Sequence, residues 1–159
     1  MIIRRVGPDE AAAWRAIRLE ALATVPEAFS ARLADWQDRP LADFAAQLAA
    51  NPTFLAFDGD APVGCIAWIR DAEDAARGWI GGVFVAGAAR GSGLGHAMIG
   101  AAMADAQGAG VTKLWLDVGA GNLAAQSAYR RAGFAEVAAE ERPGTACSAC
   151  EISMWRALP

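Results

Sequence analysis

The chain has 159 residues, 55% hydrophobic and 20% charged, so it is long and apolar enough for a substantial core, and disorder is excluded. Its net charge of −4 and sequence pI of about 4.9 argue against general nucleic-acid binding. No apolar run approaches the roughly 18–20 residues of a membrane span, and the first ten residues lack the apolar stretch of a signal peptide. We therefore expect a soluble, cytoplasmic protein without a membrane partner.

Hydrophobic periodicity predicts alternating strands and helices along a single domain. The expected strands lie at residues 1–6, 53–57, 63–69, 79–85, 113–118, 134–137 and 150–155. The expected helices lie at residues 8–24, 41–50, 94–108 and 123–132. This order predicts a mixed α/β sheet whose central strand–loop–helix–strand section is parallel.

Local signals support several of these boundaries. Asp58-Gly59-Asp60 predicts a tight hairpin turn. Gly81 and Gly82, inside a predicted strand, suggest a bulge or a close approach of two backbones. Residues 27–40 are expected to form a loop, in which Phe29 and Trp36 either line a pocket or fill the edge of the core.

A glycine-rich turn at the centre of the chain carries the clearest chemistry. The strand end Val83-Phe84-Val85 leads into the turn and then into a helix. The turn consists of Arg90, Gly91, Ser92, Gly93, Leu94 and Gly95. Unpaired amides and the helix dipole attract anions at a helix start, and glycines let the backbone approach a bulky phosphate. Arg90 adds a forked donor suited to phosphate, so the turn predicts a diphosphate-binding loop.

The spacing of the glycines restricts which diphosphate the loop can bind. The dinucleotide pattern G-x-G-x-x-G fails because His96 stands where the third glycine is needed, and there is no G-K-[ST] for a nucleoside triphosphate. The turn instead fits R-x-x-G-x-G, carried by Arg90, Gly93 and Gly95.

A second motif lies 32 residues after Arg90, one helix and one strand later. Asn122 is placed as a helix N-cap, and Tyr129 lies two turns further along the same helix face. The residues that fit N-x-x-A-x-x-x-Y-x-x-x-G-F are Asn122, Ala125, Tyr129, Gly133 and Phe134. Together the two motifs resemble the acyl-CoA-binding signatures of the GNAT superfamily of N-acetyltransferases. The opening also resembles a bacterial GNAT subgroup, through Arg18, Leu19, Ala21, Leu22, Pro26, Ala28 and Phe29.

The resemblance covers nearly the whole chain and is strongest over residues 79–137. It implies a single N-acetyltransferase domain over residues 1–159, with a mixed sheet of about seven strands flanked by about four helices and splayed between strands 4 and 5. It further implies transfer of an acetyl group from the cosubstrate acetyl-CoA to an amine, without a metal.

The resemblance also implies roles for individual residues. The main chain of Phe84 and Val85 would contact the pantetheine arm and polarise the thioester carbonyl. The turn from Arg90 to Gly95, together with His96, would surround the pyrophosphate, although His96 could instead face solvent. Asn122 would contact the pantetheine. Tyr129 would hold its phenol near the sulfur as a general acid, with core packing as the alternative.

The general base is where the sequence departs from the family. Many relatives carry a glutamate near the start of the strand before the loop, whereas this chain has Trp79, Ile80, Gly81 and Gly82 there. Asp117 is the first substitute, because it lies in the strand expected beside the cosubstrate. Its alternatives are a solvent-facing strand acid or a helix-cap partner. Glu73, Asp74 and Glu151 are further substitutes in principle.

The acceptor is not encoded in any motif. We expect a small-molecule amine, since nothing in the sequence marks a peptide groove, with a protein N-terminus or lysine as the alternative. A non-catalytic acyl-CoA sensor is the rival from another class, and a homodimer is permitted but not required. Cys147 and Cys150 have C-x-x-C spacing, for which reduced thiols are favoured over a redox or zinc site. Cys65 offers a poorly placed nucleophile for a covalent route.

Overall fold

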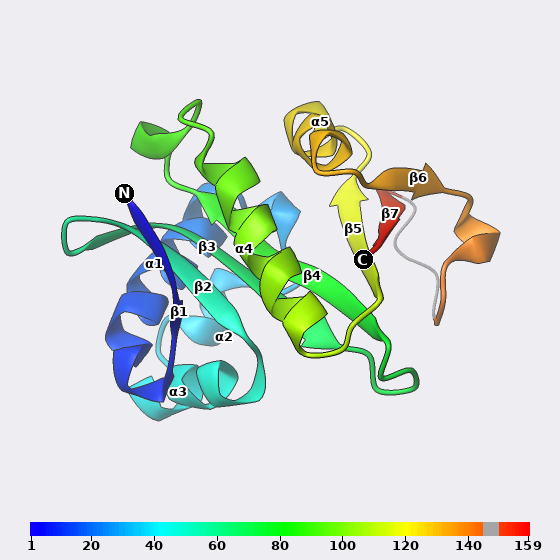
Figure 1. Cartoon of the computed structure of the whole chain (residues 1–159). Coiled ribbons are helices and arrows are strands. Elements are labelled where there is room, and N and C mark those ends of the chain that lie inside the picture. The colour runs from blue at the N-terminus through cyan, green and yellow to red at the C-terminus, as the bar shows by residue number, and fades with distance from the viewer. Residues whose placement is uncertain (145–149) are drawn as a thin grey trace.

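The computed structural model describes residues 1–144 and 150–159, which form one mixed sheet with helices on both faces (Figure 1). The strand order is β1-β2-β3-β4-β5-β7-β6. The strands are β1 (Ile2–Val6), β2 (Thr53–Asp58), β3 (Ala61–Arg70), β4 (Arg77–Val85), β5 (Lys113–Gly119), β6 (Ala135–Val137) and β7 (Glu151–Ala157). The helices are α1 (Ala11–Thr24), α2 (Leu33–Trp36), α3 (Leu41–Ala50), α4 (Leu94–Gly108) and α5 (Leu123–Arg131). Short 3-10 turns are η1 (Pro8–Glu10), η2 (Pro26–Ala28), η3 (Gly87–Ala89) and η4 (Ala139–Glu141).

All seven predicted strands and all four predicted helices are confirmed. Among the described strands β4 and β5 alone pair in parallel, which confirms the predicted central section. Two local predictions were incomplete. The expected loop at residues 27–40 contains the short helix α2, and β4 begins at Arg77 rather than Trp79 because Arg77 pairs with Lys113 across the sheet.

The two faces of the sheet bury separate clusters of apolar side chains. Alternation along β2 sends Phe54 and Ala56 to one face and Leu55 and Phe57 to the other. The first cluster includes α4, α5 and the apolar residues of β5, whereas the second joins α1 and α3 to β2, β3 and the end of β4. In Figure 1, α4 accordingly lies in front of the sheet and α1 behind it.

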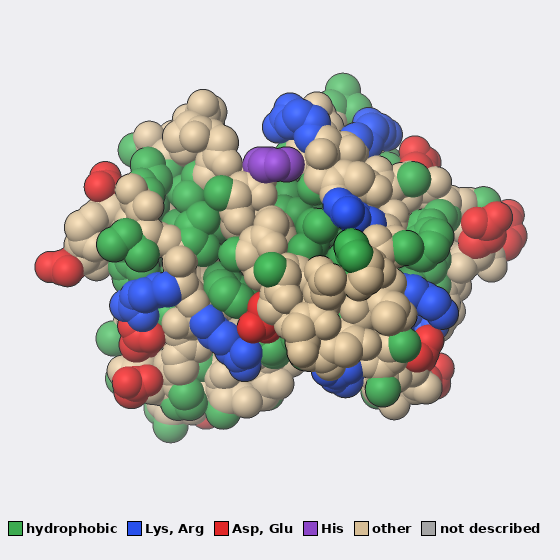
Figure 2. All heavy atoms as spheres, viewed as in Figure 1, with side chains coloured by type: hydrophobic (Ala, Val, Ile, Leu, Met, Phe, Trp, Pro, Cys, Tyr) green, Lys and Arg blue, Asp and Glu red, His purple; other side chains and the backbone are tan. Residues whose placement is uncertain are grey.

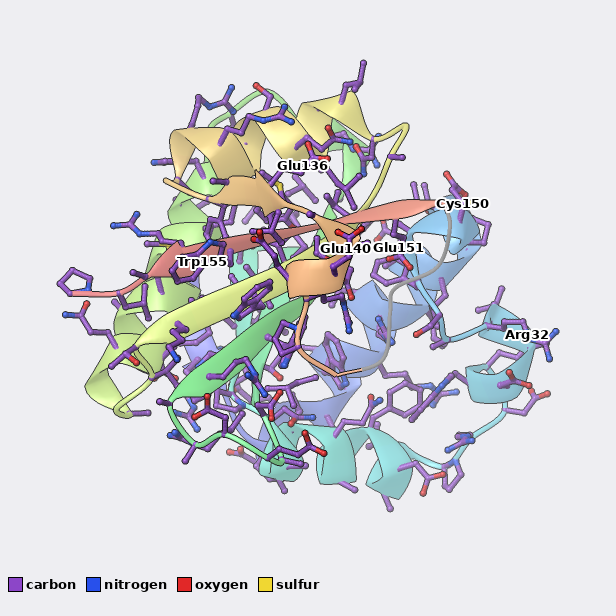
Figure 3. The ribbon with its side chains drawn as sticks, turned by 90° about the vertical axis from the view of Figure 1, so that its right-hand side faces the viewer. Arg32, Glu136, Glu140, Cys150, Glu151 and Trp155 are labelled. Atoms are coloured by element: carbon purple, nitrogen blue, oxygen red, sulfur yellow. The ribbon has the colours of Figure 1, made fainter. Side chains whose placement is uncertain are left out.

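Three expectations from the sequence concern membrane spans, metal ligands and the late cysteines. Within residues 1–144 and 150–159 no helix is long and apolar enough to cross a membrane. In the same ranges no three His, Cys, Asp or Glu side chains gather as a potential metal site. Cys147 lies outside the described residues, and Cys150 is exposed at the start of β7 (Figure 3).

Candidate active site

The parallel strands β4 and β5 are paired only at their beginnings. The ladder joins Arg77 to Lys113, Gly78 to Leu114 and Trp79 to Trp115, and β4 then continues beside β3 alone while β5 continues beside β7. The carboxyl ends of β4 and β5 therefore diverge, which confirms the predicted splay between strands 4 and 5. The divergence leaves an opening in the hydrogen-bonded ladder between the carboxyl ends of these two strands.

A β-bulge lies on the β4 side of this opening. Cys65 of β3 pairs with Phe84 while Ala67 pairs with Gly81, so two residues of β4 face one residue of β3. Gly82, inside the bulge, has a φ of +63°, which a side chain would strain. The bulge predicted from Gly81 and Gly82 is confirmed, and it turns the end of β4 away from the regular ladder.

Cys65 is locked behind the bulge. Its side chain is fully buried, and its Sγ donates a hydrogen bond to the carbonyl oxygen of Gly82 over 3.1 Å. Burial raises the pKa of this thiol to about 12, partly offset by the nearby Arg18 charge. The sulfur therefore stays protonated and shielded at neutral pH, which argues against a covalent acyl-cysteine route.

The glycine-rich loop follows β4 directly. Gly91 and Gly93 have φ values of +77° and +81°, and a Cβ on either would meet no atom within 4 Å, so the space in front of the loop is open. Ser92 and Arg90 brace the loop, through Ser92 Oγ to Ala89 O at 2.6 Å and Arg90 Nε to Val85 O at 3.0 Å. The Arg90 side chain is exposed.

The start of α4 presents backbone amides beside the loop. The first helical hydrogen bond runs from the Ala97 amide to Gly93 O, so the amides of Leu94, Gly95 and His96 precede it. The Leu94 side chain is buried in the first cluster, whereas His96 is exposed. Such amides, with the positive end of the helix dipole, bind anions. Figure 2 shows the surface hollowed between this loop and α5, with apolar side chains inside and basic ones on the α5 rim.

Helix α5 forms the other wall of the opening. Asn122 caps it, because its Oδ1 accepts a hydrogen bond from the Ala125 amide over 3.2 Å. The buried Gln126 donates from Nε2 to the carbonyl oxygens of Gly119 and Ala120 at 2.9 and 3.0 Å. Gln126 thereby fastens α5 to the end of β5. The sequence analysis missed this residue, although a glutamine on the apolar face of a predicted helix was an available signal.

Tyr129 is buried on α5 in the cluster that also holds Leu94 and Val118. Its ring meets Phe134 edge-on, with the ring centroids 5.9 Å apart. Burial raises the pKa of the phenol well above its usual value, so the hydroxyl keeps its proton throughout the neutral range. Tyr129 therefore carries a neutral hydroxyl at neutral pH.

Asp117 lies on the opposite face of β5 from Tyr129. Its Oδ1 accepts from Arg142 Nε at 3.0 Å and Ser153 Oγ at 2.7 Å, and its Oδ2 accepts from Arg142 Nη2 at 2.6 Å. The two charged side chains are largely buried. This forked pair attaches the segment after η4 to β5. Arg142 is a second residue that the sequence analysis missed.

A row of three tryptophans marks where β4 and β5 are still paired. Trp79, Trp115 and Trp155 occupy matching positions on neighbouring strands, with centroid distances of 5.9 and 5.8 Å (Trp155 is labelled in Figure 3). The Arg142 guanidinium lies over the Trp79 ring at 4.5 Å. The aromatic row stabilises the closed end of the opening.

Asp71 secures the same end of β4. Its Oδ2 accepts hydrogen bonds from Arg77 Nε at 2.9 Å and Trp79 Nε1 at 2.8 Å. The bonds from Arg77 and Trp79 hold the pKa of this carboxyl far below its usual value, against a smaller opposing effect of burial.

The depressed pKa of Asp71 makes the stability of the protein depend on acid pH. Because the folded pKa lies below the unfolded value of about 3.9, the carboxylate stabilises the fold above about pH 4 and loses this effect as the pH falls further. We expect wild type to melt at a higher temperature than Asp71→Asn at pH 7. The gap should shrink between about pH 5 and pH 3. Melting curves of both proteins over this range would contradict the assignment if the gap stayed constant.

The aromatic residues of the 27–40 segment pack against the core. Trp36 meets Phe44 edge-on at 5.3 Å, and both Trp36 and Phe29 are partly buried against the second cluster. Of the two alternatives, the structure therefore supports filling of the core edge for Trp36. Phe29 also contacts Arg18 of α1.

Comparisons with known proteins agree with this geometry. Residues 14–134 match the family described as acetyltransferase (GNAT) family. The fold is similar to a GNAT-family acetyltransferase from Streptococcus pneumoniae, with TM-score 0.82, 21% identity and 99% of each chain covered. It is also similar to the Salmonella typhimurium protein yncA, solved with its cofactor acetyl-CoA, with TM-score 0.77, 21% identity, and 100% of this chain and 94% of that chain covered.

A third similar structure is a ribosomal-protein-alanine N-acetyltransferase from Brucella melitensis, with TM-score 0.74, 22% identity, and 99% of this chain and 100% of that chain covered. A comparison with curated protein sequences gave no match. An α/β fold whose two parallel strands diverge beside a glycine-rich loop is consistent with an acyl-CoA-dependent acyltransferase. The chain belongs to the acetyltransferase (GNAT) family and is an acetyl-CoA-dependent acetyltransferase.

Proposed function

We propose that residues 1–159 form one N-acetyltransferase domain that transfers the acetyl group of acetyl-CoA directly to a primary amine of a small molecule. The observation that carries this proposal is the opening between β4 and β5, which has the glycine loop at one end and the protonated phenol of Tyr129 on one wall. An amine acceptor and a thioester donor need no further protein nucleophile.

The residues around the opening fit acetyl-CoA. The space before Gly91 and Gly93 and the amides of Leu94, Gly95 and His96 suit the pyrophosphate, with Ser92 and Arg90 bracing the loop. The apolar walls of the opening suit a pantetheine arm. We assign its contacts to Asn122 on one side and to the main chain of Phe84 and Val85 on the other.

The proposed chemistry follows from the bonds that change. Acetyl-CoA supplies a thioester, whose carbon–sulfur bond breaks as the acceptor nitrogen bonds to the carbonyl carbon. A main-chain N–H of Phe84 or Val85, aimed at the carbonyl oxygen, stabilises the negative charge that develops there. Tyr129 gives its proton to the departing sulfur. The nitrogen loses a proton to a base or to water.

Asp117 remains the candidate base from the sequence, and its surroundings define what that role requires. The carboxylate already accepts three hydrogen bonds from Arg142 and Ser153. To take a proton from the acceptor it would have to give up at least one of them. The same contacts support a second assignment, in which Asp117 anchors Arg142 to β5.

A thiol-release assay tests the proposed function. Purified protein is given acetyl-CoA and a panel of polyamines, amino acids, aminoglycosides and short peptides, and free CoA thiol is measured against time. Amine-dependent release with a small molecule supports the proposal. Release with peptides alone would assign a protein acceptor, the activity named for the Brucella relative. Tight acetyl-CoA binding without release on any amine would contradict the transfer step.

Arg90→Ala tests the diphosphate assignment of the loop. Loss of one charge-assisted contact of about 1.5–3 kcal/mol should weaken acetyl-CoA binding by roughly 10- to 100-fold. The fold should persist, because the side chain is exposed and bonds only to the carbonyl of Val85 among the described residues. Calorimetric titration measures the effect, with Arg32→Ala, at the exposed residue before α2, as a control (Arg32 is labelled in Figure 3). An unchanged dissociation constant for Arg90→Ala would overturn the assignment.

A further inference from the structure

Arg18 of α1 lies close to two aromatic rings. Its guanidinium carbon lies 5.6 Å from the centroid of Trp14 and 5.2 Å from that of Phe29. Its Nε is buried and has no hydrogen-bond partner among the described residues. The two rings thus hold the side chain in position, while its Nε makes no hydrogen bond within the described protein.

The other arginines of the chain differ from Arg18 in having polar partners. The chain has thirteen arginines and an excess of acidic side chains over basic ones. Within residues 1–144 and 150–159, the other twelve each form a hydrogen bond or an ion pair with a carboxylate, a hydroxyl or a carbonyl oxygen. The partners are Glu10, Gln37, Asp35, Asp43, Asp71, Asp105, Ala75, Val85, Glu136, Ser127, Asp117 and Ala132. Arg18 is the exception in the described chain.

An unpaired, partly buried charge is costly to a folded protein. Burial lowers the pKa of Arg18 below its ordinary value, and the one titratable neighbour that opposes this effect is the thiol of Cys65. A cationic side chain kept at this cost, beside two aromatic rings, is suited to bind an anion that arrives with a ligand.

The position of Arg18 indicates which ligand that is. Cys65, its neighbour, donates to Gly82 in the bulge of β4, so Arg18 lies close behind the opening. Helix α1 packs in the second cluster, on the face of the sheet opposite α4 and α5 (Figure 1). The glycine loop leads into α4, so a cosubstrate bound there enters from the α4 face. The diphosphate loop and Arg18 thus belong to opposite faces of the sheet, which leaves the acceptor as the ligand we assign to the α1 face.

We propose that the acceptor is a small amino acid, whose carboxylate binds the guanidinium of Arg18 beside Trp14 and Phe29 while its amine reaches the opening at the β4 bulge. This inference rests on the proposed function, since it names the substrate class of the same site. Arg18 is then a substrate-binding residue that selects for a negative charge on the acceptor.

The test compares free α-, β- and γ-amino acids with their carboxamides as acceptors. Acid and amide differ in the pKa of the amine, so the informative quantity is how Arg18→Met changes the acid-to-amide ratio of kcat/KM. We expect this ratio to fall by about 10- to 100-fold, through KM for the acid, while the KM for acetyl-CoA stays constant. Arg18→Lys should recover part of the loss. Arg15→Met, on the same helix, is the matched control and should leave the ratio unchanged.

Stability and binding measurements separate the possible failures. Because Arg18 is unpaired, Arg18→Met should melt at the same temperature as wild type or higher, whereas a purely structural arginine would lower it. If amines are acetylated but the ratio does not move in Arg18→Met, this inference is overturned and the proposed function stands. If no amine is acetylated, titration of N-acetylamino acids in the presence of CoA tests whether Arg18 binds a carboxylate. Binding to wild type that is lost in Arg18→Met supports carboxylate recognition without transfer. Equal binding to both proteins, or binding to neither, overturns the inference.

Discussion

Tyr129→Phe should lower kcat by about 10²–10³-fold and leave the affinity for acetyl-CoA nearly unchanged. General-acid catalysis contributes rate factors of this size, and phenylalanine removes only the hydroxyl that would protonate the departing sulfur. Burial raises the pKa of Tyr129, so wild type keeps this proton at every pH at which the assay is run. The ring of the variant retains its edge-on contact with Phe134. The free energy of unfolding should therefore change by about 1 kcal/mol or less.

Thiol release under saturating acetyl-CoA measures this effect, with melting temperature and cosubstrate affinity determined on the same preparations. Ser127→Ala, on the exposed side of α5, is a control for changes in the helix itself. A Tyr129→Phe enzyme that turns over at the wild-type rate would assign the tyrosine to core packing alone. A variant that fails to bind acetyl-CoA would place the phenol in recognition of the cosubstrate rather than in proton transfer.

Much of the fold could be predicted because its signals are local. The Asp58-Gly59-Asp60 turn, the Asn122 cap and the positive φ of Gly82 each depend on residues within a few positions of one another. The pattern of apolar side chains identified the strands, and the strand–loop–helix–strand order predicted that the central strands are parallel. The short helix α2 was missed because four residues carry too little periodicity to be distinguished from a loop.

The residues of the candidate site were likewise predictable where they lie close together in the sequence. The residues of the glycine loop and of α5 could be proposed because each motif lies on a continuous segment of about six to thirteen residues. The structure places Leu94 and Tyr129 in one buried cluster, consistent with the two motifs lying around one opening.

The other polar features of the site depend on long-range register. Asp117 and Arg142 are 25 residues apart in sequence, and their pairing requires the segment after η4 to lie across β5. The unpaired state of Arg18 is likewise invisible in the sequence, since it depends on which carboxylates come near a residue in the folded chain. Alternation along β5 put Asp117 near the opening but could not show that its oxygens are already bonded.

The ion pair between Asp117 and Arg142 gives the largest expected effect on stability. Removing one member of a largely buried ion pair costs about 3 kcal/mol or more. For a chain of this length that corresponds to a fall in melting temperature on the order of 10 °C. We expect Asp117→Asn and Arg142→Met each to show such a fall. The double variant should be more stable than the sum of the two single effects predicts, because the interaction between the two side chains can be lost only once.

Activity measured well below the melting temperatures decides between the two roles of Asp117. If Asp117 anchors Arg142, both single variants should keep kcat within about threefold of wild type, since neither group touches the reacting atoms. If Asp117 is the general base, Asp117→Asn alone should lose about 10²–10⁴-fold in kcat, whereas Arg142→Met should retain activity because it leaves the carboxylate in place. The three hydrogen bonds already made by the Asp117 carboxylate favour the first outcome. The second outcome would assign the base that the strand before the glycine loop does not supply.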